Sequence, residues 1–303
     1  MTPFRVLLWG RAEYERQVDW GARLAGVDVT SAQGEDAPLE LADVVVVPSR
    51  QAVRREHVPR LLRAKLVLTT TSGFDHVDVA ALGEVGIPCA RLPLARRDAV
   101  VQTALGMMLS LSRRLGALQE PAARGHWDRA DLPGWAPGLL GTVGVVGHGV
   151  IGSVVARQLE ALGARVLRCD PLLTDSVPVD ALVAQADVVT LHCELTPSSR
   201  DLFDARRIAA MRPGSILVNT ARGGLVDVRA AREALEAGHL AGLGLDVFPT
   251  EPPADLARFV GPRCIVTPHA AGWHPGLDAL IAEGIVAAVD AVRRGEPAPF
   301  TLR

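Results

Sequence analysis

A six-residue loop with three glycines is the first feature of the sequence with a clear chemical use. The loop, GHGVIG, follows the strand-like stretch TVGVV and precedes the helix-like stretch SVVARQLEALG. In that setting Gly147 would make the tight turn, Gly149 would let a pyrophosphate approach the backbone, and Gly152 would let the helix pack close to the strand. The free N–H groups at the helix N-terminus would hold the phosphates. The predicted dinucleotide loop comprises Gly147, His148, Gly149, Val150, Ile151 and Gly152.

An aspartate lies at the end of the next predicted strand. Asp170 follows Gly152 by 18 residues, and its carboxylate could accept hydrogen bonds from the ribose hydroxyls of adenosine while repelling a 2′-phosphate. Pro171 and the two leucines after it provide no arginine to hold such a phosphate. This pattern favours NAD over NADP. The alternative is an ordinary turn residue at a strand end.

Three segments farther along the chain carry an arginine, a glutamate and a histidine. NTARGG, DVFPTEP and TPHAAG each follow a strand-like run, and they contain Arg222, Glu251 and His269. Open α/β sheets bind ligands at the carboxyl ends of their strands, so these side chains are candidates for one site. Taken singly, each has an ordinary alternative: a helix-capping arginine, a surface glutamate and a satisfied histidine.

The elements that must position these residues alternate between strands and helices. Six strand candidates, GTVGVVGHG, RVLRCDP, DVVTLHC, SILVNT, GLGLDV and CIVTPH, are separated by segments of helix length. Such repetition predicts a doubly wound parallel sheet. A second α/β unit is predicted from strand-like runs near residues 6–9, 43–48 and 66–70, and residues 99–118 and 277–294 read as helices. Residues 121–141 read as an irregular connection.

With these motifs in this order, the sequence resembles the D-isomer-specific 2-hydroxyacid dehydrogenase family. The resemblance rests on GHGVIG, LHCELTPSSRDLF, LVNTARGGLVD, GLGLDVFPTEPP and VTPHAAG, and it extends upstream to TTSGFDHVDVAALGEVGI near Thr70. It implies an NAD-dependent enzyme that moves a hydride between nicotinamide and a 2-keto/2-hydroxy acid. In that reaction His269 would exchange the proton, Glu251 would orient the imidazole, and Arg222 would bind the substrate carboxylate.

The resemblance also implies the rest of the site and the domains. Asp246 would face the nicotinamide side, and the backbone N–H groups of residues 71–73 would face the substrate. The implied cofactor set adds Pro171, His192, Cys193, Thr196, Thr220, Ala221, Asp246, His269 and Gly272, and the implied substrate set is Ser72, Gly73, Arg222 and His269. A flavodoxin-like substrate-binding domain would take residues 1–95 plus 275–303, and a Rossmann NAD-binding domain residues 96–274. Relatives usually form homodimers through the cofactor domain, which points to residues 100–141.

Several positions depart from the family pattern. Glu194 replaces a proline, Gln102 replaces a glutamate, and the loop expected at residues 93–98 contains Arg96 and Arg97. One interpretation is a second anion site for a substrate with a phosphate, a phosphonate or a second carboxylate. The alternative is a solvated loop with an ion pair to the next residue, an aspartate. Trp273 could wall the substrate pocket or pack as an apolar residue.

The sequence is also compatible with two other functions. Some relatives are NADH-sensing corepressors that keep the three residues, and a phosphite dehydrogenase could use the same scaffold. Formate enzymes of the family pair the histidine with an amide, so Glu251 argues against formate. Turnover with a panel of keto acids would separate an enzyme from a sensor.

Composition excludes several classes of protein. The 303 residues suit two domains, and 49% hydrophobic with 22% charged residues suits packed cores. A net charge of −2 without a basic stripe argues against a general nucleic-acid binder. We predict no membrane partner, no metal site, and a cytoplasmic location, since no apolar run approaches about 20 residues and no signal peptide is evident. The cysteines Cys89, Cys169, Cys193 and Cys264 have no CxxC spacing, as expected of buried reduced thiols.

Overall fold

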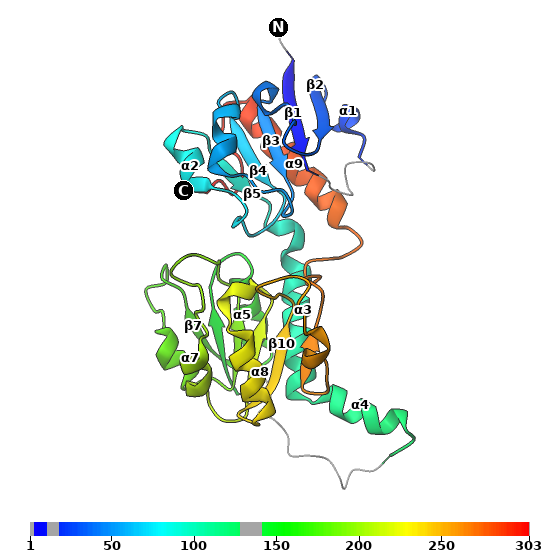
Figure 1. Cartoon of the computed structure of the whole chain (residues 1–303), viewed down its shortest axis with the longest axis vertical. Coiled ribbons are helices and arrows are strands. Elements are labelled where there is room, and N and C mark those ends of the chain that lie inside the picture. Colours follow the sequence, from blue (N-terminus) through cyan, green and yellow to red (C-terminus); the bar gives the residue numbers. More distant parts are fainter. Residues whose placement is uncertain (1–2, 11–17, 128–140, 303) are drawn as a thin grey trace. The chain divides into compact units, whose positions relative to one another are not determined.

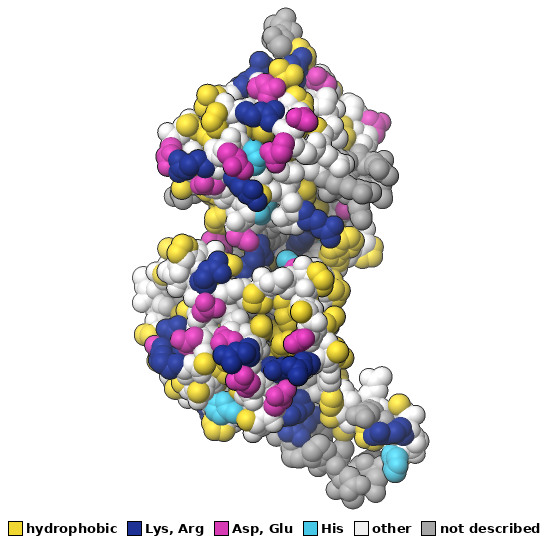
Figure 2. All heavy atoms as spheres, in the orientation of Figure 1, with side chains coloured by type: hydrophobic (Ala, Val, Ile, Leu, Met, Phe, Trp, Pro, Cys, Tyr) yellow, Lys and Arg dark blue, Asp and Glu magenta, His cyan; other side chains and the backbone are white. Residues whose placement is uncertain are grey.

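A computed structural model describes residues 3–10, 18–127 and 141–302 of the chain. The chain folds into two compact units (Figure 1). The first combines residues 1–96 with residues 274–303, and the second contains residues 97–273. Basic and acidic side chains are interspersed over the visible face of each unit (Figure 2).

The first unit is built on a five-stranded parallel sheet. Its strands are β1 (Phe4–Trp9), β2 (Val27–Ala32), β3 (Val44–Val47), β4 (Leu66–Thr69) and β5 (Cys89–Arg91). Their order in the sheet is β2-β1-β3-β4-β5, and every adjacent pair is parallel. This is the flavodoxin-like order, as the sequence predicted. All four valines of β3 are buried, because a central parallel strand is covered on both faces.

Helical segments from both ends of the chain cover this sheet. They are α1 (Trp20–Arg23), η2 (Leu39–Leu41), η3 (Arg55–Arg60), α2 (Val79–Glu84) and α9 (Leu277–Arg293). Ile281, Ile285 and Val289 recur every fourth residue of α9 and join the core cluster that contains Val46 and Leu68. The C-terminal helix is therefore part of the core of the N-terminal unit.

The second unit is built on a six-stranded parallel sheet. Its strands are β6 (Thr142–Val146), β7 (Arg165–Cys169), β8 (Val188–Leu191), β9 (Ser215–Asn219), β10 (Leu240–Leu245) and β11 (Cys264–Val266). The strand order is β11-β10-β9-β8-β6-β7, and all pairs are parallel. From β6 the chain adds β7 on one side, and it then crosses back to add β8 to β11 on the other side, so the order reverses between β6 and β8. This order departs from the usual dinucleotide-binding arrangement, in which a third strand pairs beyond the second. Here only Val177 takes that place, and its N–H donates to the Arg168 carbonyl at 2.8 Å.

Helices pack on both faces of the six-stranded sheet. They are α3 (Leu94–Ser112), α5 (Gly152–Ala161), α6 (Val179–Val183), α7 (Ala205–Ala210) and α8 (Val228–Glu236), with short turns η4 (Gly223–Leu225) and η5 (Leu256–Phe259). Helix α4 (Leu115–Ala123) follows α3 and extends away from the sheet (Figure 1). Met108 of α3 and Leu159 of α5 share one core cluster with Val145. Leu182 of α6, Ile208 of α7 and Ala231 of α8 share the other.

The structure corrects three expectations about local elements. The segment expected as a loop at residues 93–98 contains the first turn of α3, which begins at Leu94. The helix expected at 99–118 is two helices, α3 and α4, with Arg114 in the left-handed region between them (φ +52°). The irregular connection expected at 121–141 still contains helix up to Ala123, and residues 128–140 lie outside the described part of the chain.

Within residues 3–10, 18–127 and 141–302, no helix has the length and apolar character that a membrane span requires. In the same ranges, no group of three or more histidine, cysteine or acidic side chains is arranged to hold a metal ion.

Candidate active site

The glycine loop joins β6 to α5 at the point where the strand order reverses. Gly147 has a φ of +89°, and a Cβ added there would overlap the backbone of Cys193. A Cβ on Gly152 would overlap the carbonyl oxygen of Gly147. At Gly149, in contrast, a Cβ would meet no described atom within 4 Å. Two glycines thus close the turn, and the third leaves its backbone open to a ligand.

Asp170, after β7, is hydrogen-bonded to the glycine loop. One carboxylate oxygen accepts the N–H of His148 at 2.6 Å, and the other accepts the N–H of Leu172 at 2.9 Å. The Asp170 N–H donates to the Ser176 hydroxyl at 3.0 Å. Each carboxylate oxygen has a second lone pair, so the side chain can hold the loop and still accept a ribose hydroxyl. The turn-residue alternative and the cofactor role are therefore compatible.

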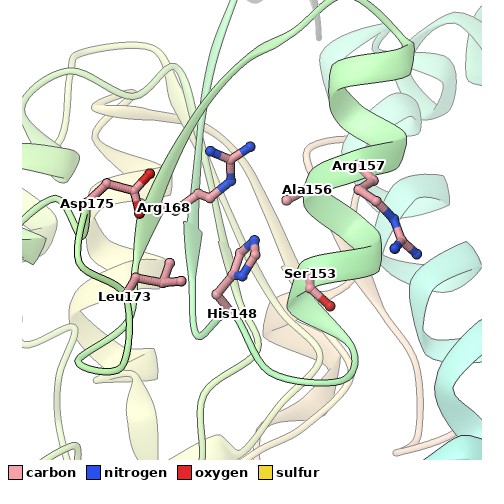
Figure 3. A pocket seen from close by; sticks show the side chains of 7 residues that line it. All are labelled: His148, Ser153, Ala156, Arg157, Arg168, Leu173 and Asp175. Carbon is pink, nitrogen blue, oxygen red and sulfur yellow. The ribbon is translucent and has the colours of Figure 1, made fainter.

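A hollow of about 320 Å³ lies beside the loop, between α5 and the end of β7 (Figure 3). The His148 side chain points into it from the loop (Figure 3). Its lining residues are His148, Ser153, Ala156, Arg157, Arg168, Leu173 and Asp175. Arg168 forms an ion pair with Glu160 of α5. The loop therefore has open space on its helix side, although the sequence singled out only His148 among these residues.

The segment after β8 borders the glycine loop. His192 Nε2 lies 2.9 Å from the Thr190 hydroxyl, and burial lowers the pKa of His192 to about 4, so its imidazole is neutral at pH 7. Thr196 Oγ1 accepts the Ser199 N–H at 3.2 Å and thus organises its own turn. Burial raises the pKa of the Cys193 thiol to about 12. Cys193 therefore contacts the glycine loop through its backbone, and its thiol is protonated and unreactive at pH 7.

Glu251 and His269 form a direct pair. His269 Nδ1 lies 2.7 Å from one carboxylate oxygen of Glu251, and the other oxygen accepts the Phe248 N–H at 3.0 Å. The glutamate is thereby held from both sides, and its exposed fraction is 37% against 50% for the histidine. If Nδ1 donates to the carboxylate, Nε2 is the ring nitrogen left for a contact with a ligand.

Asp246, after β10, shapes the loop that carries His269. Its side chain is only 2% exposed and accepts the Thr267 hydroxyl at 2.6 Å, the Ala270 N–H at 2.8 Å and the Ala271 N–H at 3.1 Å. Its carbonyl accepts the His269 N–H at 2.8 Å. His269 itself has a φ of +53°, and Gly272 ends the same turn. The hydrogen bonds of Asp246 therefore support the loop that carries His269.

Arg222 lies after β9, beside the strands that precede the other two residues. Its Nη1 donates to the Ala221 carbonyl at 2.8 Å. Strands β9, β10 and β11 are adjacent and parallel, and Arg222, Glu251 and His269 each follow one of them. All three residues therefore lie at one edge of the sheet. Asn219 and Phe248 were not among the residues predicted from the sequence. Asn219 could have been found as a polar residue at the end of an apolar strand, and Phe248 as part of the turn that follows the next strand.

In the first unit, the loop after β4 has its carbonyl groups bound by arginines. Arg96 Nη1 donates to the Thr70 carbonyl at 2.6 Å, and Arg91 Nη1 donates to the Ser72 carbonyl at 2.9 Å. The Thr71 hydroxyl donates to the Gly73 carbonyl at 2.7 Å. Arg96 is thus a tether for the loop that contains Ser72 and Gly73.

Two further candidates are placed by the structure. Arg97 forms an ion pair with Asp98 at 2.7 Å. This is the contact expected if the two arginines lie in a solvated segment and do not form a second anion site. Trp273 is 64% exposed, so it is not a buried core residue. Trp273 is therefore accessible to a ligand, whereas Arg97 is bound to its neighbour in the chain.

Comparison with known proteins fits this arrangement of strand-end residues. Residues 105–271 match the family described as D-isomer specific 2-hydroxyacid dehydrogenase, NAD binding domain. The chain belongs to this family. A glycerate dehydrogenase of Methylorubrum extorquens is 33% identical over 270 residues, which cover 86% of this chain and 85% of the relative. A D-3-phosphoglycerate dehydrogenase of Mycobacterium tuberculosis is 34% identical over 258 residues, which cover 80% of this chain. This 2-hydroxyacid dehydrogenase chain spans about half of that relative, at 48% of its length.

Solved structures of the family share the fold. A D-lactate dehydrogenase of Aquifex aeolicus, solved with NAD and lactic acid, has a TM-score of 0.84 at 26% identity, covering 96% of both chains. A glyoxylate reductase of Paecilomyes thermophila has a TM-score of 0.87 at 25% identity, covering 100% of this chain and 99% of that one.

The residues present fit NAD, the cofactor of this family domain. Gly149 leaves space at the N-terminus of α5, and Asp170 has acceptor capacity at the end of β7. The Thr220 hydroxyl is buried without a hydrogen-bond partner among the described residues, at the end of β9. These features lie at the carboxyl ends of the strands, where dinucleotides bind in such sheets.

Proposed function

We propose that this protein is an NAD-dependent oxidoreductase that transfers a hydride between nicotinamide and C2 of a small 2-keto/2-hydroxy acid. The observation that carries the proposal is the Glu251–His269 pair at 2.7 Å, at the same sheet edge as Arg222. A carboxylate, an imidazole and a guanidinium together provide what ketone reduction needs from a protein: a proton and a site for a carboxylate. Membership of the 2-hydroxyacid dehydrogenases supports it.

His269 acts as the acid in reduction and the base in oxidation. Bound NADH supplies the hydride. As the carbonyl oxygen of the substrate gains negative charge, His269 donates the proton from Nε2 to it. The resulting neutral imidazole keeps its Nδ1 proton because that proton is held by Glu251. Before the transfer, the same Nδ1–H hydrogen bond to Glu251 holds the ring in place.

Arg222 binds the substrate carboxylate. A guanidinium presents two parallel N–H groups that match the two carboxylate oxygens, and this fixes the orientation of the keto acid. We propose that the backbone N–H groups of Ser72 and Gly73 bind the substrate, in a loop that Arg91 and Arg96 hold by its carbonyl groups. The accessible Trp273 is proposed to wall the pocket.

The contacts of the two unusual arginines bear on the substrate. Arg96 donates to a backbone carbonyl and Arg97 is paired with Asp98, so both have structural work to do. These contacts favour a small monoanionic keto acid such as glyoxylate or hydroxypyruvate over one with a phosphate or phosphonate. Relatives named glycerate dehydrogenase and hydroxypyruvate reductase support the same class, whereas others are named D-3-phosphoglycerate dehydrogenase, so the panel of test substrates includes a phosphorylated acid.

The decisive test is turnover of NADH with a panel of keto acids, in the wild-type protein and in His269→Ala. We expect turnover of at least one small 2-keto acid, and a fall in kcat of about 10²- to 10⁴-fold in the variant with NADH affinity nearly intact. Glu251→Gln keeps the shape but not the charge and should fall between the two. Tight NADH binding without any turnover would instead favour a cofactor-sensing protein.

We propose a homodimer formed through the cofactor-binding unit. Helix α4 projects away from the sheet of that unit (Figure 1), and Leu115 at its start is 51% exposed. Trp127, just after it, is 93% exposed. Large apolar side chains on a projecting helix are typical of association surfaces.

The four unpaired cysteines support a reducing, cytoplasmic location.

A further inference from the structure

Asn219, the last residue of β9, makes two hydrogen bonds to the loop that carries Arg222. Its side-chain oxygen accepts the Ala221 N–H at 3.0 Å, and its amide nitrogen donates to the Arg222 carbonyl at 2.9 Å. The residue is 0% exposed, so water cannot take over either bond. Asparagine can do this because one short side chain carries both a donor and an acceptor.

The next residue along the loop touches the segment that leads to Glu251. A Cβ on Gly223 would overlap the backbone of Phe248 and Pro249, so the two segments meet without an intervening side chain. The Phe248 N–H in turn donates to Glu251, which pairs with His269. A continuous set of contacts therefore runs from Asn219 through the arginine loop to the acid–base pair.

From these contacts we infer that Asn219 is a positioning residue that fixes Arg222 relative to the Glu251–His269 pair. This inference rests on the proposed function, because it assumes that Arg222 binds the substrate carboxylate. Asn219 acts through backbone groups only: it sets the direction in which the Arg222 side chain leaves the loop. A misplacement of about 1 Å in such a group can cost about 10²-fold in rate.

The test compares two substitutions that remove different parts of the contact. Asn219→Ala removes both hydrogen bonds, whereas Asn219→Asp keeps the size and the acceptor but puts a carboxylate against the Arg222 carbonyl. We expect both to raise KM for hydroxypyruvate or glyoxylate by about 10- to 100-fold. The Kd of oxamate in the NADH complex should rise in parallel. The pH profile of kcat should keep the wild-type shape, because the Asn219 side chain has no hydrogen bond to Glu251 or His269. Any rise in the Kd of NADH should be smaller than the rise in KM, because the Asn219 side chain holds only one N–H of the cofactor segment, that of Ala221.

Asp187→Ala is the matched control for stability. Its carboxylate accepts the Thr142 N–H at 2.8 Å at the opposite, amino end of the same sheet. This variant should lower Tm as Asn219→Ala does while leaving KM unchanged. If Asn219→Ala also lowers only Tm, or if Asn219→Asp behaves as wild type, Asn219 is a structural filler and the inference is wrong.

A double-mutant cycle separates this inference from the proposed function. If Asn219 acts through Arg222, adding Asn219→Ala to Arg222→Ala should change kcat/KM by less than about threefold, because residues that act as a unit are not additive. Full additivity would overturn the positioning role while leaving the proposed function intact. A normal kcat/KM in Arg222→Ala alone would overturn both.

Discussion

At the scale of the residue, the site depends on side chains that make two contacts at once. Glu251 holds the Phe248 N–H with one oxygen and His269 with the other, and Asp170 holds two backbone N–H groups. A carboxylate has about four acceptor positions, so it can fix a loop and still meet a ligand. These contacts fix the direction of the imidazole and the shape of the glycine loop.

The double use of Asp170 gives a prediction about cofactor choice. Asp170→Ala removes the ribose acceptor and one bond to the loop, so we expect the Kd of NADH to rise about 10- to 100-fold, the range for hydrogen bonds to a charged group. The Kd of NADPH should change much less, because the repulsion of its 2′-phosphate is also removed. Fluorescence titration measures both.

The control for this experiment is Asp180→Asn on α6, the helix that follows the same loop, whose carboxylate pairs with Arg207. It removes a nearby negative charge without touching the glycine loop and should leave NADH binding within about twofold. Equal weakening of NADH and NADPH in Asp170→Ala would remove Asp170 from the ribose site.

At the scale of the element, the strand-to-helix turn after β6 requires glycine for two different reasons. Gly152 is packed against the carbonyl of Gly147, whereas Gly149 faces open space. The fold requires glycine at position 152, whereas the open space at position 149 matches the proposed requirement of a bound cofactor. The two are indistinguishable in a GxGxxG pattern, but they separate once the contacts of each position are known.

Alanine substitutions at these two glycines should therefore behave differently. Gly152→Ala should lower Tm and weaken NADH binding more than about tenfold, because its Cβ meets backbone that cannot move aside. Gly149→Ala should leave the Tm of the cofactor-free protein unchanged but weaken NADH, because the methyl group takes the space of the pyrophosphate. Thermal unfolding with and without NADH gives both quantities. A loss of Tm in Gly149→Ala would contradict the assignment of its open face to a ligand.

At the scale of the whole molecule, the chain forms two units, and each is a parallel sheet covered by helices. The unit with residues 97–273 contains the glycine loop, Asp170 and all three strand-end residues. The other unit, which needs the C-terminal helix α9 for its core, presents the arginine-tethered loop at residues 70–73. The proposed substrate loop and the proposed catalytic residues therefore belong to different units of the chain.

The proposed homodimer is testable at this scale. Leu115→Asp places a charge on the exposed start of α4, and we expect the mass measured by light scattering to fall from that of a dimer to that of a monomer. Leu162→Asp, at an equally accessible leucine (45% exposed) after α5, should leave the dimer intact. A monomeric wild-type protein, or a dimer that survives Leu115→Asp, would exclude α4 as the interface.

The sequence by itself determined the features that depend on local chemistry. Parallel strands buried on both faces read as apolar runs, and the glycine loop, Asp170 and the three strand-end motifs are visible because turns and helix starts require particular residues. Two strands escaped this reasoning: β2 is a partly exposed edge strand and β5 has only three residues, so neither leaves a strong apolar signal.

Only the tertiary structure decided which of these segments meet. The adjacency of β9, β10 and β11 places Arg222, Glu251 and His269 at one edge, and no local pattern contains that order. The same holds for Asn219 under the arginine loop and for Arg96, which lies in a helix and binds the Thr70 carbonyl 26 residues away. Local sequence encodes burial and turns, whereas strand order and long-range contacts arise from packing the whole chain.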